Sequence, residues 1–521
     1  MSSSPPDAVA AVPDGAYVRV AGVAAFCVAW RVLSLGALEN DHFVHLARAH
    51  QLLHGYWPLR DFSDPGLPGQ YMLSALAGWA FGIAPLVDVL LQAAMLAIAA
   101  GLTLRLAERA SGSGLVGTAV ALVQVLSMPR LYAAPKLLVH AVAIALAWRY
   151  LDAPTRRRAA WLGAWTACAF LLRHDHGIFV GLIAVGCVLA RRAGRARQWW
   201  GDAAALAGTA ALLLLPWAIY VEAVAGFAAY LESALAFSRA EAVRTVRQWP
   251  GLADASQSPG AAIRTAALYI SLLLPPLLCG AAWQRRGRVP AAHLMAVACL
   301  LVLCEVGYLR DRMLDRLPDI GAPAAIAAAA LFGLSRPGRA IGAVAVAGAL
   351  TVGAIFVLPR LASVSTRVGG RLGDVLDGGT RWPWTRMLST PDLLPLVRYV
   401  DACTAPGDPV LAGWFAPEFS VFARRPFAGG HPAWVPGYYS TPQEQAQIAR
   451  WLDAAPPRVF LDDGTLASAW PAVYAALVGS SRMTLAGSVQ VDGRPVRIWL
   501  RDAAPGLATY SGLALPCPSP R

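Results

Sequence analysis

Ionisable side chains gather in residues 37–62, ALENDHFVHLARAHQLLHGYWPLRDF, directly after an apolar run long enough to cross a membrane. Glu39 and Asp41 open this segment, and a helical stripe of apolar residues follows until Gly55. In one interpretation Asn40 or Asp41 only caps the short helix. In the other, Glu39 or Asp41 faces a cavity as a catalytic carboxylate that takes a proton from a hydroxyl or an amine.

A second cluster, RHDHG at residues 173–177, joins two apolar runs with almost no connecting loop. Polar side chains at a membrane boundary cost free energy, so they are often retained for a function. The cluster is either a tight surface turn or part of a site. In a site, Asp175 would be a second carboxylate, and Arg173 would bind phosphate or orient Asp41.

Cations near the ends of apolar runs form a third group. Lys136, the single lysine of the chain, follows Pro135 at the start of an apolar run. It either extends its ammonium group to the membrane interface or contacts a phosphate. The segment YLRDRMLDRLPD (308–319) is either a solvated helix with internal ion pairs or a phosphate-binding segment. Because cationic groups, and the guanidinium fork above all, suit phosphate oxygens, we expect several of these residues to converge on one phosphate: Arg60, Lys136, Arg173, Arg310, Arg312 and Arg316.

Metal binding is the weaker alternative for the first cluster. Asp41 and His45 are close enough in sequence to share a helix face, and so are His42 and His45. However, the chain has no HxxEH-like pattern and no CxxC pair. We therefore expect no cofactor, and keep His42 and His45 as alternative ligands of a divalent cation.

The elements that must position these groups are those of a polytopic α-helical membrane protein. Of 521 residues, 57% are hydrophobic and 14% are charged, and the mean hydropathy is +0.50. Soluble domains contain about 25% charged residues. The apolar stretches that are long enough to cross a bilayer predict about eleven transmembrane helices, at residues 16–36, 85–107, 113–129, 133–150, 158–173, 176–191, 203–221, 261–283, 290–309, 321–335 and 339–359.

The net charge of +13 does not indicate nucleic-acid binding, because most of the excess lies in short arginine-rich connectors between apolar stretches. By the positive-inside rule these connectors face the cytoplasm, provided that residues 67–84 do not cross the membrane. We therefore expect 67–84 to lie at the outer surface, as part of a catalytic outer loop 38–84. Residues 1–15 lack a basic region typical of a cleavable signal peptide and are expected to form a cytoplasmic tail.

The composition changes near residue 360. We expect a transmembrane domain over 16–360 and an extracytoplasmic α/β domain over 361–521, since strand-like and helical runs alternate there. No glycine-rich nucleotide-binding motif is present. The expected elements of this domain are strands at 408–414 and 458–463, a helix at 443–452 and a hairpin at 483–502 that turns at Asp492-Gly493.

Three features of the outer face have two interpretations each. Cys403 and Cys517 could form a disulfide in an oxidising compartment, but the sequence does not give their distance. Residues 237–249 could form an amphipathic helix against the leaflet or a flap over the site. The segment GGHPAWVPGYY (429–439) could contact a sugar or an acceptor, or could be an ordinary packed loop.

The order of motifs in residues 39–71 resembles that of a known family. Two acids, a short amphipathic helix ending in glycine, the YWPLRDF segment and a proline-rich turn into an apolar helix follow one another as in the GT-C glycosyltransferases of the ArnT and protein O-mannosyltransferase type, which the chain resembles. Members of this family take a sugar from a polyprenyl-phosphate carrier on the outer leaflet. Many relatives have adjacent Asp-Glu where this chain has ENDH, so the choice between Glu39 and Asp41 stays open, and we favour Asp41.

The resemblance implies a transferase of the bacterial inner membrane, with a glycan, a lipid or a protein as acceptor. Asp41, Glu39 and Asp175 would be its catalytic carboxylates, and the six cations given above would hold the carrier phosphate. We expect substrate contacts from four further residues of these segments, Asp61, Asp64, Tyr71 and His174.

A transporter or flippase for a lipid-linked glycan is the alternative function. It predicts inverted repeats and ionisable residues near the centres of the spans. Neither is evident, because the acids and arginines cluster at the ends of the apolar stretches. A scaffold that has kept the fold without catalysis is a third interpretation, and the joint presence of Asp41, Arg60, Lys136 and Asp175 argues mildly against it.

Overall fold

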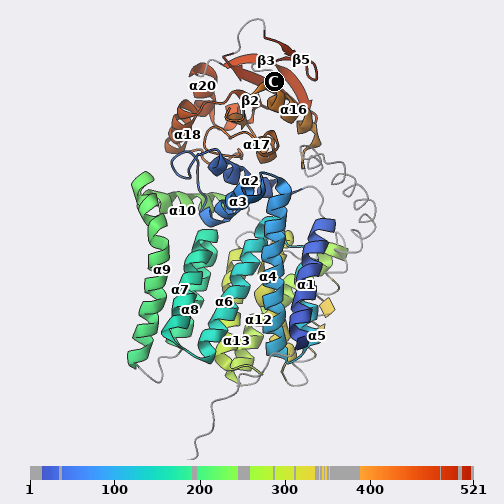
Figure 1. The fold of residues 1–521 in the computed structure, drawn as a ribbon, viewed down its shortest axis with the longest axis vertical. Helices are drawn as coiled ribbons and strands as arrows, with labels where there is room; N and C mark the ends of the chain where they lie inside the picture. Colours follow the sequence, from blue (N-terminus) through green and yellow to red (C-terminus); the bar gives the residue numbers. More distant parts are fainter. Residues whose placement is uncertain are drawn as a thin grey trace, which may run out of the picture.

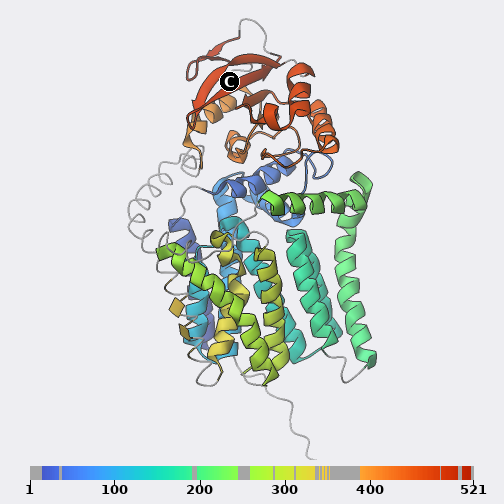
Figure 2. The ribbon, with the colours of Figure 1, turned by 180° about the vertical axis from the view of Figure 1, so that it is seen from behind.

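The protein consists of a helical bundle with a smaller mixed α/β domain on one end (Figures 1 and 2). The computed structural model describes residues 14–34, 38–190, 196–244, 259–284, 288–309, 313–334, 388–480, 483–502 and 507–517, and also 340, 343–344, 347–348 and 351.

Ten of the predicted spans correspond to helices of the bundle. Their bounds are α1 (Asp14–Leu33), α4 (Pro85–Ser111), α5 (Gly114–Leu126), α6 (Ala134–Asp152), α7 (Arg156–Leu172), α8 (His174–Leu189), α9 (Ala196–Val224), α12 (Pro259–Trp283), α13 (Ala291–Leu309) and α14 (Gly321–Phe332). Among the described residues, six helical stretches are long and apolar enough to cross a membrane, within α1, α4, α6, α9, α12 and α13. The multi-span prediction is confirmed, whereas the total of eleven stays a prediction, because 339–359 falls mostly outside the described residues.

The helix boundaries follow from local signals at the connectors. Gly112 ends α4 with a φ of 71°, which glycine adopts without strain. Ser113 and Thr155 cap α5 and α7, because their side-chain oxygens accept the N–H groups of Val116 and Arg158. These polar connectors lie at the end of the bundle away from the α/β domain (Figure 1).

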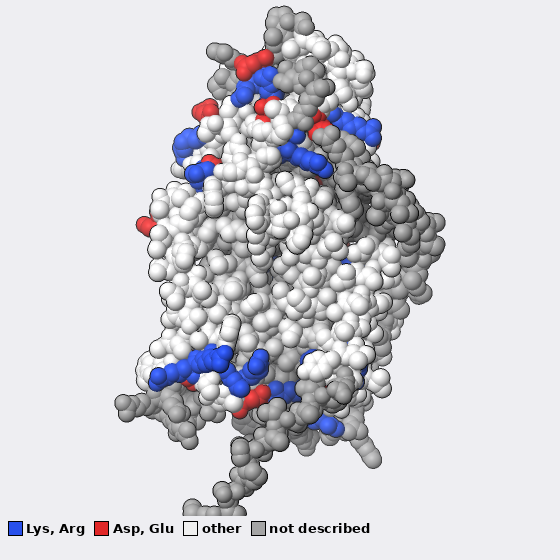
Figure 3. Space-filling model, in the orientation of Figure 1, with Lys and Arg blue, Asp and Glu red and all other residues white. Residues whose placement is uncertain are grey.

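Charged side chains form two zones that are separated by an uncharged belt on the visible face (Figure 3). One zone covers the α/β domain and its junction with the bundle. The other lies at the far end, where α4 ends with Arg105 and Arg109 and where α7 begins with Arg156. A belt without charge is what the hydrocarbon layer of a membrane requires.

Three helices lie across the end of the bundle that faces the α/β domain (Figures 1 and 2). They are α2 (Asn40–Leu53), α3 (Pro68–Phe81) and α10 (Phe227–Arg244). The expected surface segment 67–84 thus forms a short helix of 14 residues, which is not among the candidate spans. The expected amphipathic helix at 237–249 overlaps α10 up to Arg244, and its remainder falls outside the described residues.

The α/β domain contains a four-stranded sheet in the order β1-β2-β4-β3. Strands β1 (Val410–Ala412) and β2 (Val459–Asp462) are parallel, whereas β3 (Met483–Val491) and β4 (Arg494–Arg501) form an antiparallel hairpin. Asp492 and Gly493, both with positive φ, make its turn, as expected. The predicted strands and hairpin are therefore confirmed. The predicted helix at 443–452 is α18 (Pro442–Ala454), and its Thr441 and Glu444 form a reciprocal capping box.

The remaining elements of this domain surround the sheet. They are the 3-10 turn η4 (Pro391–Leu393), α16 (Leu394–Cys403), α17 (Pro417–Ala423), α19 (Thr465–Ala469), α20 (Pro471–Ser480), β5 (Thr509–Tyr510) and β6 (Leu515–Pro516). Cys403 at the end of α16 and Cys517 beside β6 form a disulfide with their Cα atoms 4.9 Å apart. The disulfide that the sequence left open therefore joins elements that are 114 residues apart in the chain.

The α/β domain contacts the loop region 38–67 directly. Gln51 in α2 donates a hydrogen bond of 2.9 Å to the carbonyl oxygen of Phe427 and accepts one of 3.1 Å from its N–H. The N–H of Ser63 donates to Gly430, and its Oγ lies 2.8 Å from Nδ1 of His431. Gly430 has a φ of +73°, and a Cβ there would lie 2.0 Å from the ring of Trp451. The loop 427–431 therefore packs against the segment 38–67.

Candidate active site

A cavity of about 430 Å³ lies between the bundle and the α/β domain. One wall of the cavity is charged and the other is uncharged, and the two walls come from different parts of the chain. The bundle side supplies the charged lining residues Asp41, Arg48, Arg130, Lys136, Arg173, Asp175 and Arg316. The other side consists of uncharged residues of α10 and of the α/β domain, Ala234, Phe237, Ser238, Phe415, Pro432, Ala433, Val435, Tyr438 and Tyr439.

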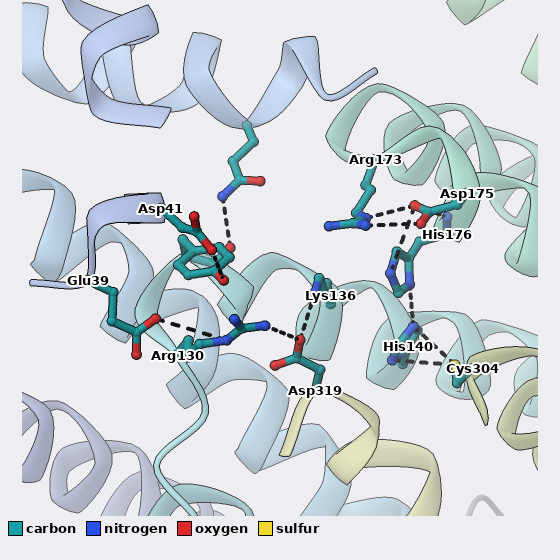
Figure 4. Close-up of polar contacts among 12 residues, drawn as sticks. Glu39, Asp41, Arg130, Lys136, His140, Arg173, Asp175, His176, Cys304 and Asp319 are labelled. Carbon is teal, nitrogen blue, oxygen red and sulfur yellow. Dashed lines mark hydrogen bonds and ion pairs between the residues drawn. The ribbon is translucent and has the colours of Figure 1, made fainter. Parts of the chain in front are cut away.

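Asp41, labelled in Figure 4, lies in the first turn of α2. The hydroxyl of Tyr132 donates a hydrogen bond of 2.8 Å to Oδ2 of Asp41. The residue at the N-cap of α2 is Glu39, whose side chain makes no capping hydrogen bond. Tyr132 is held in turn by Gln70, which donates to its carbonyl oxygen at 2.9 Å. The carboxylate of Asp41 is thus fixed from outside its own helix.

Glu39 has a different environment from Asp41. Its side chain is 52% exposed, and its Oε2 lies 4.0 Å from Nε of Arg130. Glu39 lines a neighbouring apolar cavity but does not line the charged one. Two carboxylates that are two residues apart in sequence therefore face two different spaces.

The buried Asp319 pairs with two cations that line the cavity, Lys136 and Arg130 (Figure 4). Nζ of Lys136 lies 2.7 Å from Oδ2 of Asp319, and a terminal nitrogen of Arg130 lies 3.4 Å from the same oxygen. Arg130 also stacks over the ring of Tyr132, 4.8 Å from its centroid. Burial alone would raise the pKa of Asp319, but Lys136 and Arg130 outweigh it, so that the pKa of Asp319 is lowered. Asp319 is therefore ionised at neutral pH.

Arg173 and Asp175 form a second ion pair on the cavity wall (Figure 4). Nε and a terminal nitrogen of Arg173 lie 2.8 and 3.1 Å from the two carboxylate oxygens of Asp175. Such a two-point pairing fixes both side chains. The N–H of His176 also donates to Asp175 at 2.9 Å. The ring of His176 contacts that of His140 at 2.8 Å, and His140 in turn lies 3.3 Å from the sulfur of Cys304.

The two histidines proposed as alternative metal ligands face different partners. Nε2 of His42 in α2 lies 2.8 Å from Oδ2 of Asp88 in α4, and both side chains are buried. His45 lines the cavity with its ring 5.5 Å from that of Tyr132, and burial holds the pKa of His45 well below its ordinary value. Among the residues that the structure describes, no group of three or more His, Cys, Asp or Glu is placed to hold a metal ion.

The predicted substrate contacts divide into supporting and lining residues. Asp64 accepts the N–H groups of Gly66 and Leu67 and the hydroxyl of Tyr230, at 3.1, 3.2 and 2.6 Å. Tyr71 is fully buried and packs edge to face against Phe62. Asp64 and Tyr71 thus hold the loop before α3 without lining the cavity. His174 does line it and bonds the carbonyl oxygen of Gly66 through its N–H.

Arg60 and Asp61 lie in the first loop but outside the cavity. They pair with each other at 2.7 Å, and neither lines the cavity. The carbonyl oxygen of Arg60 accepts a hydrogen bond of 2.8 Å from Trp451 of the α/β domain. Of the other proposed cations, Lys136, Arg173 and Arg316 line the cavity, whereas Arg310 and Arg312 fall outside the described residues.

The sequence analysis did not single out Arg48, Arg130, Tyr132 or Asp319. Arg130 and Tyr132 lie shortly before Lys136, and Asp319 ends YLRDRMLDRLPD, so these residues lie beside positions that the sequence analysis named. What was missing is the pairing, because Lys136 and Asp319 are 183 residues apart in the chain. Only the packing of the 3-10 segment η2 (Leu314–Ile320) against α6 brings them together.

A second cavity, of about 790 Å³, adjoins the first and shares Arg130 and Met313 with it. Side chains of α5, α12 and α14 line most of it, including Val120, Ile270 and Ala325. This cavity is mainly apolar, and the described charged residues on its walls are Glu39, Arg130, Arg264 and Asp315.

Comparisons with known proteins bear on the fold. No protein-family model matches the chain, and no curated protein matches it in sequence. The structure is similar to that of ArnT from Cupriavidus metallidurans bound to undecaprenyl phosphate, with a TM-score of 0.51 and 15% identity over 94% of this chain and 98% of ArnT. For ArnT in the apo state the TM-score is 0.50, with 15% identity over 93% and 98%. The resemblance expected from the sequence is thus confirmed at the level of the fold.

Proposed function

We propose that this protein is a membrane glycosyltransferase that moves a sugar from a polyprenyl-phosphate carrier to a glycan, lipid or protein acceptor. The observation that carries the proposal is the shared cavity of Asp41 and the cations Lys136 and Arg130. Such a transfer needs a carboxylate base at the acceptor and cations at the phosphate leaving group. The fold similarity to ArnT, whose structure contains undecaprenyl phosphate, supports the same class of carrier.

The carrier is divided between the two cavities in this proposal. Its isoprenoid chain lies in the apolar cavity, where burying each CH₂ group contributes about 0.8 kcal/mol. Its phosphate lies where the cavities meet, beside Arg130 and within reach of Lys136. The sugar then extends into the charged cavity toward Asp41.

The reaction follows from this placement. The acceptor oxygen or nitrogen attacks the anomeric carbon of the sugar, and Asp41 takes the acceptor proton. The bond between that carbon and the phosphate oxygen breaks, and its electron pair stays on the phosphate. The products are the glycosylated acceptor and polyprenyl phosphate. Lys136 and Arg130 stabilise the negative charge that grows on the phosphate.

The other residues have subordinate roles in this proposal. Asp175 orients Arg173, and Arg173 and Arg316 face the phosphate of the carrier. Glu39 is the second candidate for the base, and its distance from the charged cavity makes us favour Asp41. Arg60, Asp61, Asp64 and Tyr71 shape the first loop, and His174 bonds that loop at Gly66. Arg310 and Arg312, which lie outside the described residues, stay proposed ligands of the carrier phosphate.

The α/β domain is proposed to face the outside of a bacterial inner membrane. Described arginines at the end of α4 and the start of α7, namely Arg105, Arg109 and Arg156, lie at the opposite end of the bundle, and the Cys403–Cys517 disulfide suits an oxidising compartment. A reporter fused after residue 521 should report an extracytoplasmic position, whereas one inserted at residue 154 should report the cytoplasm. The reverse pair of signals would overturn the orientation.

The function is tested with purified protein and a polyprenyl-phosphate sugar. We expect release of polyprenyl phosphate that depends on an acceptor and yields one glycosylated acceptor per carrier released. Mass spectrometry of both products measures this stoichiometry. Movement of intact lipid-linked sugar between vesicle leaflets, without release, would instead favour the flippase alternative.

A further inference from the structure

Asp319 is a buried aspartate that pairs with two cations through the same carboxylate oxygen. It is 7% exposed, and Lys136 and Arg130 both approach its Oδ2, at 2.7 and 3.4 Å. Its other oxygen, Oδ1, is buried and accepts no hydrogen bond within the described part of the chain. The described hydrogen-bond and ion-pair partners of this carboxylate are therefore the two cations themselves.

Among the described acids, Asp319 is the one that pairs with both Lys136 and Arg130, since Glu39 approaches Arg130 only, at 4.0 Å. The neighbouring Arg173 is already paired at two points with Asp175. Removing the Asp319 carboxylate would take from Lys136 its described ion-pair partner and leave Arg130 with the half-exposed Glu39 at 4.0 Å, where the carrier phosphate is proposed to bind. The net positive charge at the phosphate position would thus rise by one unit if Asp319 were neutral.

The carrier changes its charge during the reaction. The donor is a phosphodiester with one negative charge, whereas the product is a phosphomonoester that carries about −1.5 to −2 at neutral pH. Cations that stabilise the developing charge also hold the product more tightly than the donor. Release of product limits the turnover of many enzymes. Excess positive charge at this position would therefore slow turnover by slowing the release of polyprenyl phosphate.

We propose that Asp319 is a positioning residue that limits the positive charge of the Lys136–Arg130 pair, so that the monoanionic donor binds and the dianionic product leaves. This inference rests on the proposed function. Without carrier, Asp319 occupies the two cations in place of the phosphate. When the carrier binds, Asp319 continues to neutralise one of the two charges.

The test measures binding of two ligands of equal chain length, polyprenyl phosphate and its methyl phosphodiester. Titrations at about pH 8 keep the monoester doubly charged, since its second pKa is about 6. In Asp319→Asn we expect the affinity for the monoester to rise about tenfold more than that for the diester, because a second unit charge responds to the lost carboxylate. Asp319→Glu should retain the wild-type ratio of affinities.

Asp152→Asn is the matched control, because Asp152 accepts hydrogen bonds from Arg109 and His293 at the opposite end of the bundle. It should leave the ratio of the two affinities unchanged. Asp319→Ser is a second neutral variant in case the asparagine protein does not fold. If neither neutral variant folds, or if the ratio stays at its wild-type value, Asp319 is only a structural partner and the inference is overturned.

Binding needs no turnover, which separates the two hypotheses. Wild-type protein that transfers no sugar would overturn the proposed function. A neutral variant that binds both ligands with the wild-type ratio would overturn the role of Asp319 alone. In variants that do transfer sugar, the inhibition constant of polyprenyl phosphate relative to the donor KM should move in parallel with the binding ratio.

Discussion

Asp41→Asn protein should release polyprenyl phosphate at least about 100-fold more slowly than wild type, since a general base contributes about 10²–10⁴ in rate. The asparagine keeps the size of the side chain and can still accept the hydrogen bond of Tyr132, so the cavity is preserved. The amide cannot take the acceptor proton. The loss should therefore appear in kcat, with little change in the affinity for polyprenyl phosphate.

Two variants serve as controls for Asp41. Glu39→Gln should retain most of the activity, because Glu39 is half exposed and does not line the charged cavity. Tyr132→Phe removes only the hydrogen bond to the carboxylate and should cost about 10- to 100-fold, as expected for one hydrogen bond to an ionised group. Full activity of Asp41→Asn would exclude Asp41 as the base. Loss of activity in Glu39→Gln alone would assign the base to Glu39.

Lys136→Met should lower the rate of transfer by about 10²–10³, the cost of removing one group that stabilises a developing oxyanion. Methionine fills the same volume as the lysine stem but leaves Asp319 with Arg130 as its cation. The affinity for polyprenyl phosphate should fall as well, because the leaving group loses one of its two nearest cations. Single-turnover release of carrier and equilibrium titration with polyprenyl phosphate measure the two effects.

Arg109→Gln is the control for the loss of a paired cation. Arg109 donates two hydrogen bonds to Asp152 at the opposite end of the bundle. Like Lys136→Met, Arg109→Gln takes a cation away from an ion-paired aspartate, but it does so far from the cavity. Its transfer rate should stay near that of wild type. If Lys136→Met also transfers sugar at the wild-type rate, Lys136 is an interfacial lysine and the phosphate lies elsewhere.

The likeness of this fold to ArnT could be anticipated from residues 39–71, although the sequences are only 15% identical. The reason is that the first loop combines several local signals, namely a helix start after acids, a glycine stop and a proline-started helix. Each of them is encoded by neighbouring residues. Arg60 and Asp61 nevertheless lie outside the cavity, because the loop turns their paired side chains outward, which spacing alone does not indicate.

By itself, the sequence determined the membrane bundle, the helix α3 that lies across its end and the hairpin of the α/β domain. These elements depend on hydrophobic length, periodicity and turn residues, which are properties of neighbouring positions. Only the tertiary structure decided that Asp319 pairs with Lys136, that Tyr132 holds Asp41, and that Glu39 and Asp41 face different cavities. Such contacts arise from packing between elements far apart in the chain, and no local pattern specifies which polar side chain meets which.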